Sequence, residues 1–263
     1  MSFFTSFAKR HSLMTFFGLA YALSWWPSLF TAGGLNPFGP LLAALIIVLL
    51  IGGKDGLKEW WGRVTRWRGS LGWYATALLL PFAINFVAAA LTVLFGAPFP
   101  TGDKIARWPE LFITFPLYLI VLGPLGEEPG WRGFAMPRIL ENRTALAASL
   151  ILGIFVAVWH LPLVVSGQQP SVILLAIIAS QIMYTWLANH VEGKVLIVIV
   201  AHAAQGGLGG EYFGAMFTGA DAGLETTLLV ATQCLVAIGI VLLTGSRLTR
   251  RQPVTAPADI STS

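Results

Sequence analysis

Two adjacent glutamates and two histidines are the residues of this sequence that could carry chemistry. Glu127 and Glu128 directly follow an apolar run, and His160 and His202 each lie inside another apolar run. Ionisable groups inside a membrane cost roughly a few kcal/mol each, so they need a reason to be there. Two imidazoles and a carboxylate form a known zinc-ligand set that leaves one position open for water. A water bound to zinc, or activated by a glutamate, would be a nucleophile for peptide hydrolysis.

The spacing around the glutamates suggests separate roles for them. Arg132 follows Glu128 by four residues, one helical turn, so this pair can neutralise each other. Glu127 would then point roughly 100° away and be free for another role. Pro129 disfavours a regular helix through this segment and predicts a kink or a new helix start. The alternative interpretation is an ordinary cytoplasmic loop that contains a salt bridge.

The histidine segments contain helix breakers that would make room for a polar cavity. Pro162 predicts a kink near His160, and the glycine-rich run 206–210 predicts a loosened helix after His202. A single histidine in a bundle is more often a hydrogen-bonded packing residue than a ligand. Two of them on separate spans, with a carboxylate pair on a third, favour a site.

The composition requires a membrane. Of the 263 residues, 56% are hydrophobic and only 11% are charged, with a mean hydropathy of +0.75, whereas soluble domains carry roughly 25% charged residues. A soluble fold of this size could not hide so much apolar surface. The single cysteine, Cys234, excludes an intrachain disulfide and a cysteine-based zinc cluster.

We therefore expect an all-α, polytopic membrane bundle of about eight transmembrane helices over residues 1–246, followed by a disordered cytoplasmic tail over residues 247–263. The apolar runs are 13–31, 38–52, 71–96, 111–126, 145–165, 171–189, 194–210 and 224–245.

Loop charges predict the orientation of the bundle. Loops rich in Lys and Arg alternate with neutral or acidic ones, which puts both termini in the cytoplasm and predicts an even number of spans. The net charge of +4 then reflects contact with anionic lipid headgroups and not with nucleic acid. The glutamate pair would lie near a basic loop, so the site is expected to face the cytoplasmic side of the cell membrane.

Three motifs together resemble the CPBP family, the CAAX proteases and bacteriocin-processing (Abi) proteins. The segment 126–137 (GEEPGWRGFAMP) matches the first motif of that family closely. The segment 156–162 (VAVWHLP) resembles the second, although Val156 stands where Phe is usual. The segment 201–204 (AHAA) resembles the third. The resemblance covers about residues 111–210 and implies an intramembrane endopeptidase, a hydrolase of the metalloprotease type.

The resemblance also implies roles for individual residues. Glu127 would be the general base that activates water. Glu128, His160 and His202 would complete the catalytic set, with Glu128 and Arg132 shaping the site. Glu127, His160 and His202 would bind a divalent metal, with zinc expected; alternatively, the two histidines would position water and stabilise the oxyanion. Arg132, Trp159 and Gln205 would support the substrate or the site. The family expects Asn or Asp four residues after His202, where this chain has Gly206; a kink there would let Gln205 or a bound water substitute.

Two other functions stay open. The departure at Gly206 motivates a non-catalytic membrane scaffold or immunity protein with the same fold. Buried Glu and His could also act as a relay in a transporter, although no internal repeat supports this. The sequence lacks a His-Glu-x-x-His motif and a Gly-x-Ser-x-Gly motif, which argues against zincins and serine hydrolases. The expected partners are the lipid bilayer and a membrane protein or lipidated peptide substrate; the oligomeric state is not indicated.

Overall fold

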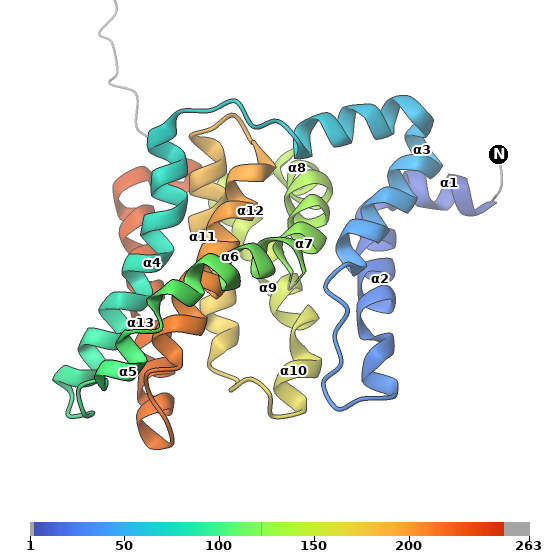
Figure 1. Cartoon of the computed structure of the whole chain (residues 1–263). Helices are drawn as coiled ribbons and strands as arrows, with labels where there is room; N and C mark the ends of the chain where they lie inside the picture. The colour runs from blue at the N-terminus through green and yellow to red at the C-terminus, as the bar shows by residue number, and fades with distance from the viewer. Residues whose placement is uncertain (1–2, 122, 250–263) are drawn as a thin grey trace, which may run out of the picture.

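The computed structural model describes residues 3–121 and 123–249, and the secondary structure of these residues is entirely helical (Figure 1). The all-α fold class expected from the sequence is therefore confirmed. The elements are α1 (Phe3–Arg10), α2 (Ser12–Trp25), η1 (Trp26–Leu29), α3 (Gly39–Val64), α4 (Leu71–Leu94), α5 (Gly102–Ile105), η2 (Trp108–Glu110), α6 (Leu111–Ile120), α7 (Pro124–Gly130), η3 (Trp131–Ala135), α8 (Met136–Leu140), α9 (Ala145–Trp159), α10 (Leu161–Val165), α11 (Ile173–Asn189), α12 (Val195–Ala203), η4 (Ala204–Gly214), α13 (Ala220–Thr244) and η5 (Gly245–Arg247).

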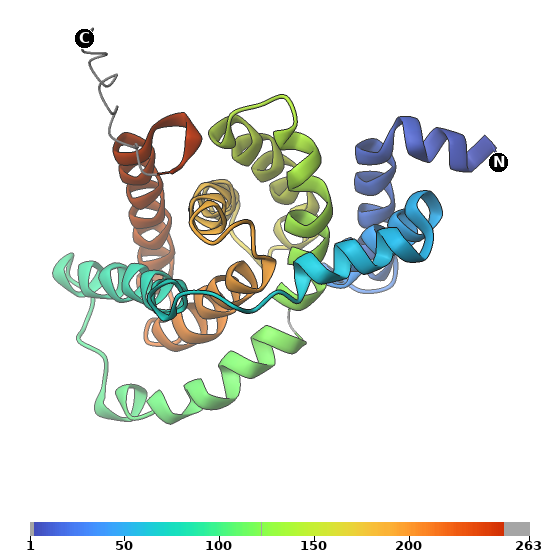
Figure 2. The same cartoon turned by 90° about the horizontal axis from the view of Figure 1, so that it is seen from above.

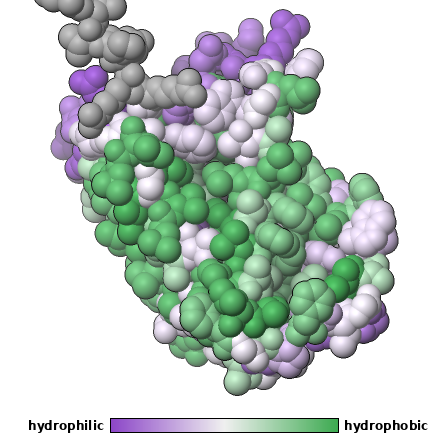
Figure 3. All heavy atoms as spheres, turned by 90° about the vertical axis from the view of Figure 1, so that its left-hand side faces the viewer, coloured by the Kyte–Doolittle hydropathy of each residue, from purple (hydrophilic) through white to green (hydrophobic). Residues whose placement is uncertain are grey.

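Several helices are built to cross a membrane. Four stretches are long and apolar enough to do so: α3, α4, the joined elements of Gly102–Leu140, and Ala220–Arg247. The helices α9 and α11 are shorter but also apolar. Figure 3 shows a broad hydrophobic surface, with hydrophilic residues gathered above it and fewer of them along its lower rim. These features describe a multi-pass membrane protein.

Helices occupy each of the eight apolar ranges that the sequence indicates. The second range is extended, because α3 continues to Val64 across a kink at Gly53, whose φ of 59° suits glycine. The fourth is divided between α6 and α7. The number of these ranges that span a bilayer stays a prediction. The predicted disordered tail lies mostly outside the described residues, since the description ends at residue 249.

The helices form two groups that meet at α7. The pair α2 and α3 lies on one side, and α7 packs on α3. On the other side α4 packs on α13 and η4, and α11 packs on α9 and α13. Figures 1 and 2 show α6 running obliquely along the outside of the bundle, where it contacts η4. This arrangement encloses the segments that carry the candidate catalytic residues.

Candidate active site

A cavity of about 290 Å³ lies between α6, α7, α9, α11, η4 and α13. Glu127 from α7, His160 from the end of α9 and His202 from α12 all line it. Gln205 and Tyr184 contribute to the same wall. The structure thus brings three predicted catalytic residues, which are far apart in the sequence, to one cavity inside the bundle that has both polar and apolar lining residues.

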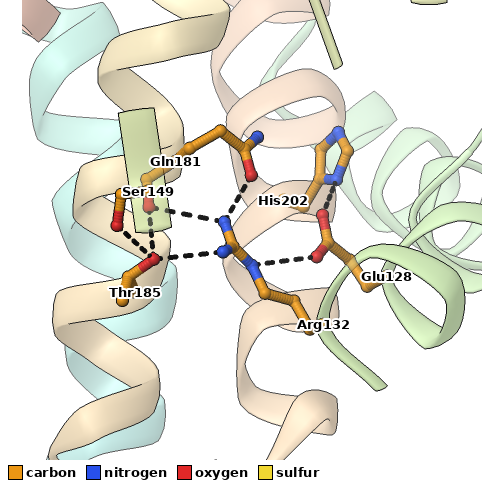
Figure 4. Close-up of polar contacts among 6 residues, drawn as sticks. All are labelled: Glu128, Arg132, Ser149, Gln181, Thr185 and His202. Atoms are coloured by element: carbon orange, nitrogen blue, oxygen red, sulfur yellow. Dashed lines mark hydrogen bonds and ion pairs between the residues drawn. The ribbon is translucent and has the colours of Figure 1, made fainter. Parts of the chain in front are cut away.

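Glu128 lies behind this cavity and holds His202 (Figure 4). Its Oε1 lies 2.8 Å from Nδ1 of His202, and its Oε2 lies 3.5 Å from Nε of Arg132. The Glu128 and Arg132 side chains are almost fully buried, at 1% and 3% exposed. The predicted pairing of Glu128 with Arg132 one turn away is confirmed. Because a carboxylate can only accept, Nδ1 of His202 donates, and Nε2 is left for the cavity.

A buried polar cluster holds Arg132 in turn. Its guanidinium donates to the side-chain oxygen of Gln181 and, at 3.1 Å, to Oγ1 of Thr185. Ser149 donates to the same Thr185 oxygen at 2.7 Å. Hydrogen bonds to a charged guanidinium fix its orientation, so this cluster positions Arg132, and through it Glu128 and His202.

Glu127 faces the cavity without a fixed partner. Its side chain is buried, and its Oε2 atom makes no hydrogen bond within the described part of the chain. Gly123, with a φ of 151°, begins the turn into α7, and a Cβ there would meet Oε1 of Glu127 at 2.5 Å. Because Gly123 has no Cβ, it leaves space for the Glu127 carboxylate. An unpartnered buried oxygen in a cavity wall is available for a water or a substrate.

His160 lies at the break between two helices. The helix α9 ends at Trp159, and α10 begins at Leu161 with Pro162 in its first turn, so the predicted kink is confirmed. Nδ1 of His160 donates to the carbonyl oxygen of Val156 at 2.8 Å. This bond fixes the ring and leaves Nε2 toward the cavity.

Trp159 supports the structure and does not line the cavity. It is buried, it packs edge-to-face against Trp131 with ring centroids 6.0 Å apart, and its carbonyl oxygen accepts a hydrogen bond from Nε1 of Trp25 at 2.9 Å. Its predicted role in support therefore applies to the helix that carries His160, not to the substrate.

Gly206 packs against a tyrosine ring from a neighbouring helix. The segment η4 is π-helical, which matches the predicted loosening after His202, and both Gln205 and Gly206 line the cavity. A Cβ at Gly206 would collide with the ring of Tyr118 on α6. The Tyr118 hydroxyl donates to Oε1 of Glu211 at 2.7 Å. The position where the resemblance expects Asn or Asp therefore faces an aromatic ring.

Two glycines let α7 pack closely against the start of α3 and the residues just before it. A Cβ at Gly126 would meet the backbone oxygen of Pro37 at 2.7 Å, and one at Gly130 would collide with the backbone of Pro40. Trp60 of α3 also donates to the carbonyl oxygen of Pro129 at 3.1 Å. Contrary to the expected kink or new start at Pro129, the helix begins earlier, at Pro124, and passes through Pro129 into the π-helical turn η3. The wider turn accommodates the missing N–H donor.

The fit of a metal to these residues is incomplete. Each cavity-lining histidine donates through Nδ1 to a carbonyl or carboxylate, as metal-ligating histidines usually do. Within residues 3–121 and 123–249, however, no three His, Cys, Asp or Glu side chains are grouped so that they could hold a metal ion, whereas catalytic zinc takes three protein ligands. The predicted zinc ligands Glu127, His160 and His202 stay a prediction, and the steps proposed below use protein side chains only.

Sequence reasoning missed the polar residues of α11. Gln181 and Thr185 are four residues apart on an apolar helix, and this spacing was the available signal for a shared buried face. Gln233 of α13 also donates to Ser180 inside the bundle. These side chains and Tyr118 lie in or beside the cavity and were not predicted.

The depth of the glutamate pair also differs from expectation. The sequence suggested a position next to the basic loop that contains Arg138 and Arg143. In the structure Glu127 and Glu128 are buried in α7, Arg138 lies in α8, and η3 and α8 separate the glutamates from the connection that contains Arg143. The apolar run 111–126 ends at the glutamates, but the helical path continues to Leu140. Helical continuity through Pro129 is what the sequence pattern did not reveal.

Comparison with known proteins agrees with this geometry. Residues 109–207 match the family described as type II CAAX prenyl endopeptidase Rce1-like. Over 98 residues the chain is 28% identical to CAAX prenyl protease 2 of Methanococcus maripaludis, a stretch that covers 33% of this chain and 36% of that relative. The matched segment contains Glu127, Glu128, Arg132, His160 and His202. Residues 109–207 of this chain are therefore similar to the Rce1-like type II CAAX prenyl endopeptidase family.

Proposed function

We propose that this protein is an intramembrane endopeptidase that hydrolyses a peptide bond of a membrane-anchored substrate. The observation that carries the proposal is the convergence of Glu127, His160 and His202 on one cavity between apolar helices. The family match supports a peptidase and a lipidated or membrane-bound peptide as its substrate. We also propose that the eight apolar ranges are eight crossings.

The proposed reaction uses Glu127 as the base. A water in the cavity gives a proton to the Glu127 carboxylate, and its oxygen attacks the carbonyl carbon of the scissile bond. The carbonyl electron pair moves onto oxygen and forms a tetrahedral oxyanion. When the C–N bond breaks, Glu127 returns the proton to the leaving nitrogen. The products are a carboxyl and an amino terminus, so atoms and charge balance.

The two histidines position the reacting groups in this proposal. His202 is held by Glu128, and His160 by the carbonyl oxygen of Val156. Their Nε2 atoms are the ring positions left for water or for the oxyanion, depending on protonation. The buried Arg132 keeps the Glu128 carboxylate in place, so His202 has one orientation when the substrate arrives.

The test is cleavage of membrane peptides by purified protein in liposomes. The isosteric Glu127→Gln variant is expected to reduce the cleavage rate by about 10²–10⁴, the usual contribution of a general base. Glu225→Gln is the matched control, because Glu225 is also a buried glutamate with an unpartnered oxygen but lies outside the cavity wall. Equal rates for the wild type and Glu127→Gln would refute the proposal.

A non-catalytic scaffold is the second candidate, and two observations favour it. Tyr118 fills the space beside Gly206, and the described residues hold no group of three metal ligands. This candidate predicts that the wild type cleaves no membrane peptide and that a cellular effect of the protein survives Glu127→Gln. Loss of that effect in Glu127→Gln, with Glu225→Gln intact, would exclude it.

A further inference from the structure

We propose that the cavity is reached from the end of the bundle opposite to the basic loops, which is the non-cytoplasmic side by charge. The proposal rests on the peptidase function proposed above and names its substrate class. The substrates are peptide segments presented at the non-cytoplasmic face of the membrane, and not lipidated C-termini at the cytoplasmic face.

The lining residues occupy the parts of their helices that are remote from the basic end. On α11, which leads to the connection that contains Lys194, the lining residues begin at Ile173 and end at Tyr184. On α13, which leads to Arg247, they are Leu229 in the first half of the helix and Gln233 near its midpoint. The cavity therefore extends away from the basic ends of both helices.

The position of His160 agrees with this placement. The helix α9 begins directly after the basic connection that contains Arg143, and His160 follows its fifteenth residue. At 1.5 Å per residue this helix advances about 22 Å, most of a hydrocarbon layer of about 30 Å. Figure 1 shows α10, which follows His160, at the end of the molecule opposite to α8.

The cavity is sealed on the basic side and more open on the other. The cluster of Arg132, Gln181, Thr185 and Ser149 is buried, with each residue at most 5% exposed, and it fills the space between η3, α9 and α11. On the opposite side the lining residues Gln169, Ile173, Gly206 and Gly210 are partly exposed. A substrate that approached from the basic side would have to displace a paired, buried arginine, which is costly.

The charges distinguish the two ends sharply. At the end that holds α1, the second half of α3 and α8, the described residues include eleven cations and four carboxylates: Lys9, Arg10, Lys54, Lys58, Arg63, Arg66, Arg68, Arg138, Arg143, Lys194 and Arg247, alongside Asp55, Glu59, Glu141 and Glu192. At the other end the described cations are Lys104 and Arg107, alongside the carboxylates Asp103, Glu110, Glu211 and Asp221.

This distribution fixes the expected side of access. Short cytoplasmic loops carry the excess of Lys and Arg, so the end with eleven cations belongs in the cytoplasm. The cavity then opens to the other side of the membrane. This reverses the sequence-based expectation of a cytoplasmic site, because that expectation placed the glutamates in the basic loop and the structure places them in α7.

The test is cysteine labelling from one side of the membrane. Cys234→Ala removes the natural thiol, and single cysteines are then introduced as Gln168→Cys and Thr101→Cys at the non-basic end and Arg66→Cys at the basic end, all exposed positions. In sealed right-side-out vesicles a membrane-impermeant maleimide should modify the first two variants. Arg66→Cys should react only after the vesicles are opened. The reverse pattern overturns the proposal.

A cysteine in the cavity then reports the side of access. Gln205→Cys lies in the cavity wall, and it should react in sealed vesicles, as Gln168→Cys does. Reaction only after the vesicles are opened, or no reaction in either state, overturns the proposal. Labelling does not depend on catalysis, so a protein that labels as expected but cleaves no peptide refutes the peptidase function and leaves the side of access standing.

Discussion

The contact between Gly206 and Tyr118 predicts a coupled change in stability. A Cβ added at Gly206 would lie far inside the 3.0 Å below which real Cβ contacts essentially never fall. The Tyr118 ring would have to retreat by about 0.8 Å or more to reach that limit, and its 2.7 Å bond to Glu211 would stretch past the normal range for O–H···O. Overpacking of this kind costs about 1–3 kcal/mol.

Gly210→Ala is the matched control for this substitution. Gly210 lies in the same π-helical segment, and its nearest neighbour to an added Cβ is the backbone oxygen of Gln205 at 3.5 Å, an ordinary contact. The control should be neutral or slightly stabilising, by up to about 1 kcal/mol, because alanine has the higher helix propensity. We therefore expect Gly206→Ala to be less stable than Gly210→Ala by about 1–3 kcal/mol.

The assay is equilibrium unfolding in mixed micelles, followed by tryptophan fluorescence. Adding Tyr118→Ala should remove most of the penalty of Gly206→Ala and leave the effect of Gly210→Ala unchanged, since only the first pair is in contact. If Gly206→Ala and Gly210→Ala are equally stable, or if the penalty persists without the tyrosine ring, the reasoning is wrong.

Three further substitutions test the packing around the glutamates by the same unfolding assay. Arg132→Met should cost about 3–5 kcal/mol, because it removes the cation that pairs with the buried Glu128 carboxylate and leaves only the bond from His202; a loss below 1 kcal/mol would contradict the ion pair. Gly130→Ala should cost at least as much as Gly206→Ala, since the atoms it meets belong to the Pro40 backbone and cannot rotate away. Trp60→Phe should cost about 1–3 kcal/mol by leaving a buried carbonyl of α7 unpaired, and an unchanged midpoint would rule that bond out as stabilising.

Local sequence patterns were sufficient to predict much of the fold and part of the site. Apolar runs of sufficient length predicted eight ranges, and each of them contains a helix. The breaks at Pro162 and at the glycine-rich run were predictable because proline and glycine act on the backbone where they stand. The pairing of Glu128 with Arg132 followed from helical spacing alone.

The features of the site that could not be predicted from the sequence depend on contacts between helices that are far apart in the chain. That His202 pairs with Glu128, and not with Glu127, is decided by how α12 packs on α7. The ring beside Gly206 comes from Tyr118, about ninety residues earlier, and no local pattern indicates it. The depth of the glutamates depends on helical continuity through Pro129, which required a π-helical turn that propensities do not predict.

The seating of α7 on α3 has a consequence for how the homologous segment should be handled. The match to the peptidase family spans residues 109–207, but the glycines that flank the glutamates press against Pro37 and Pro40, which lie outside it. Trp131 and Phe134 bury their rings against Phe16 of α2 as well. A fragment cut at the homology boundaries would expose this face of α7 and η3. The segment that matches the family is therefore shorter than the segment that has to fold together. A graft or truncation of this site has to include α2 and α3.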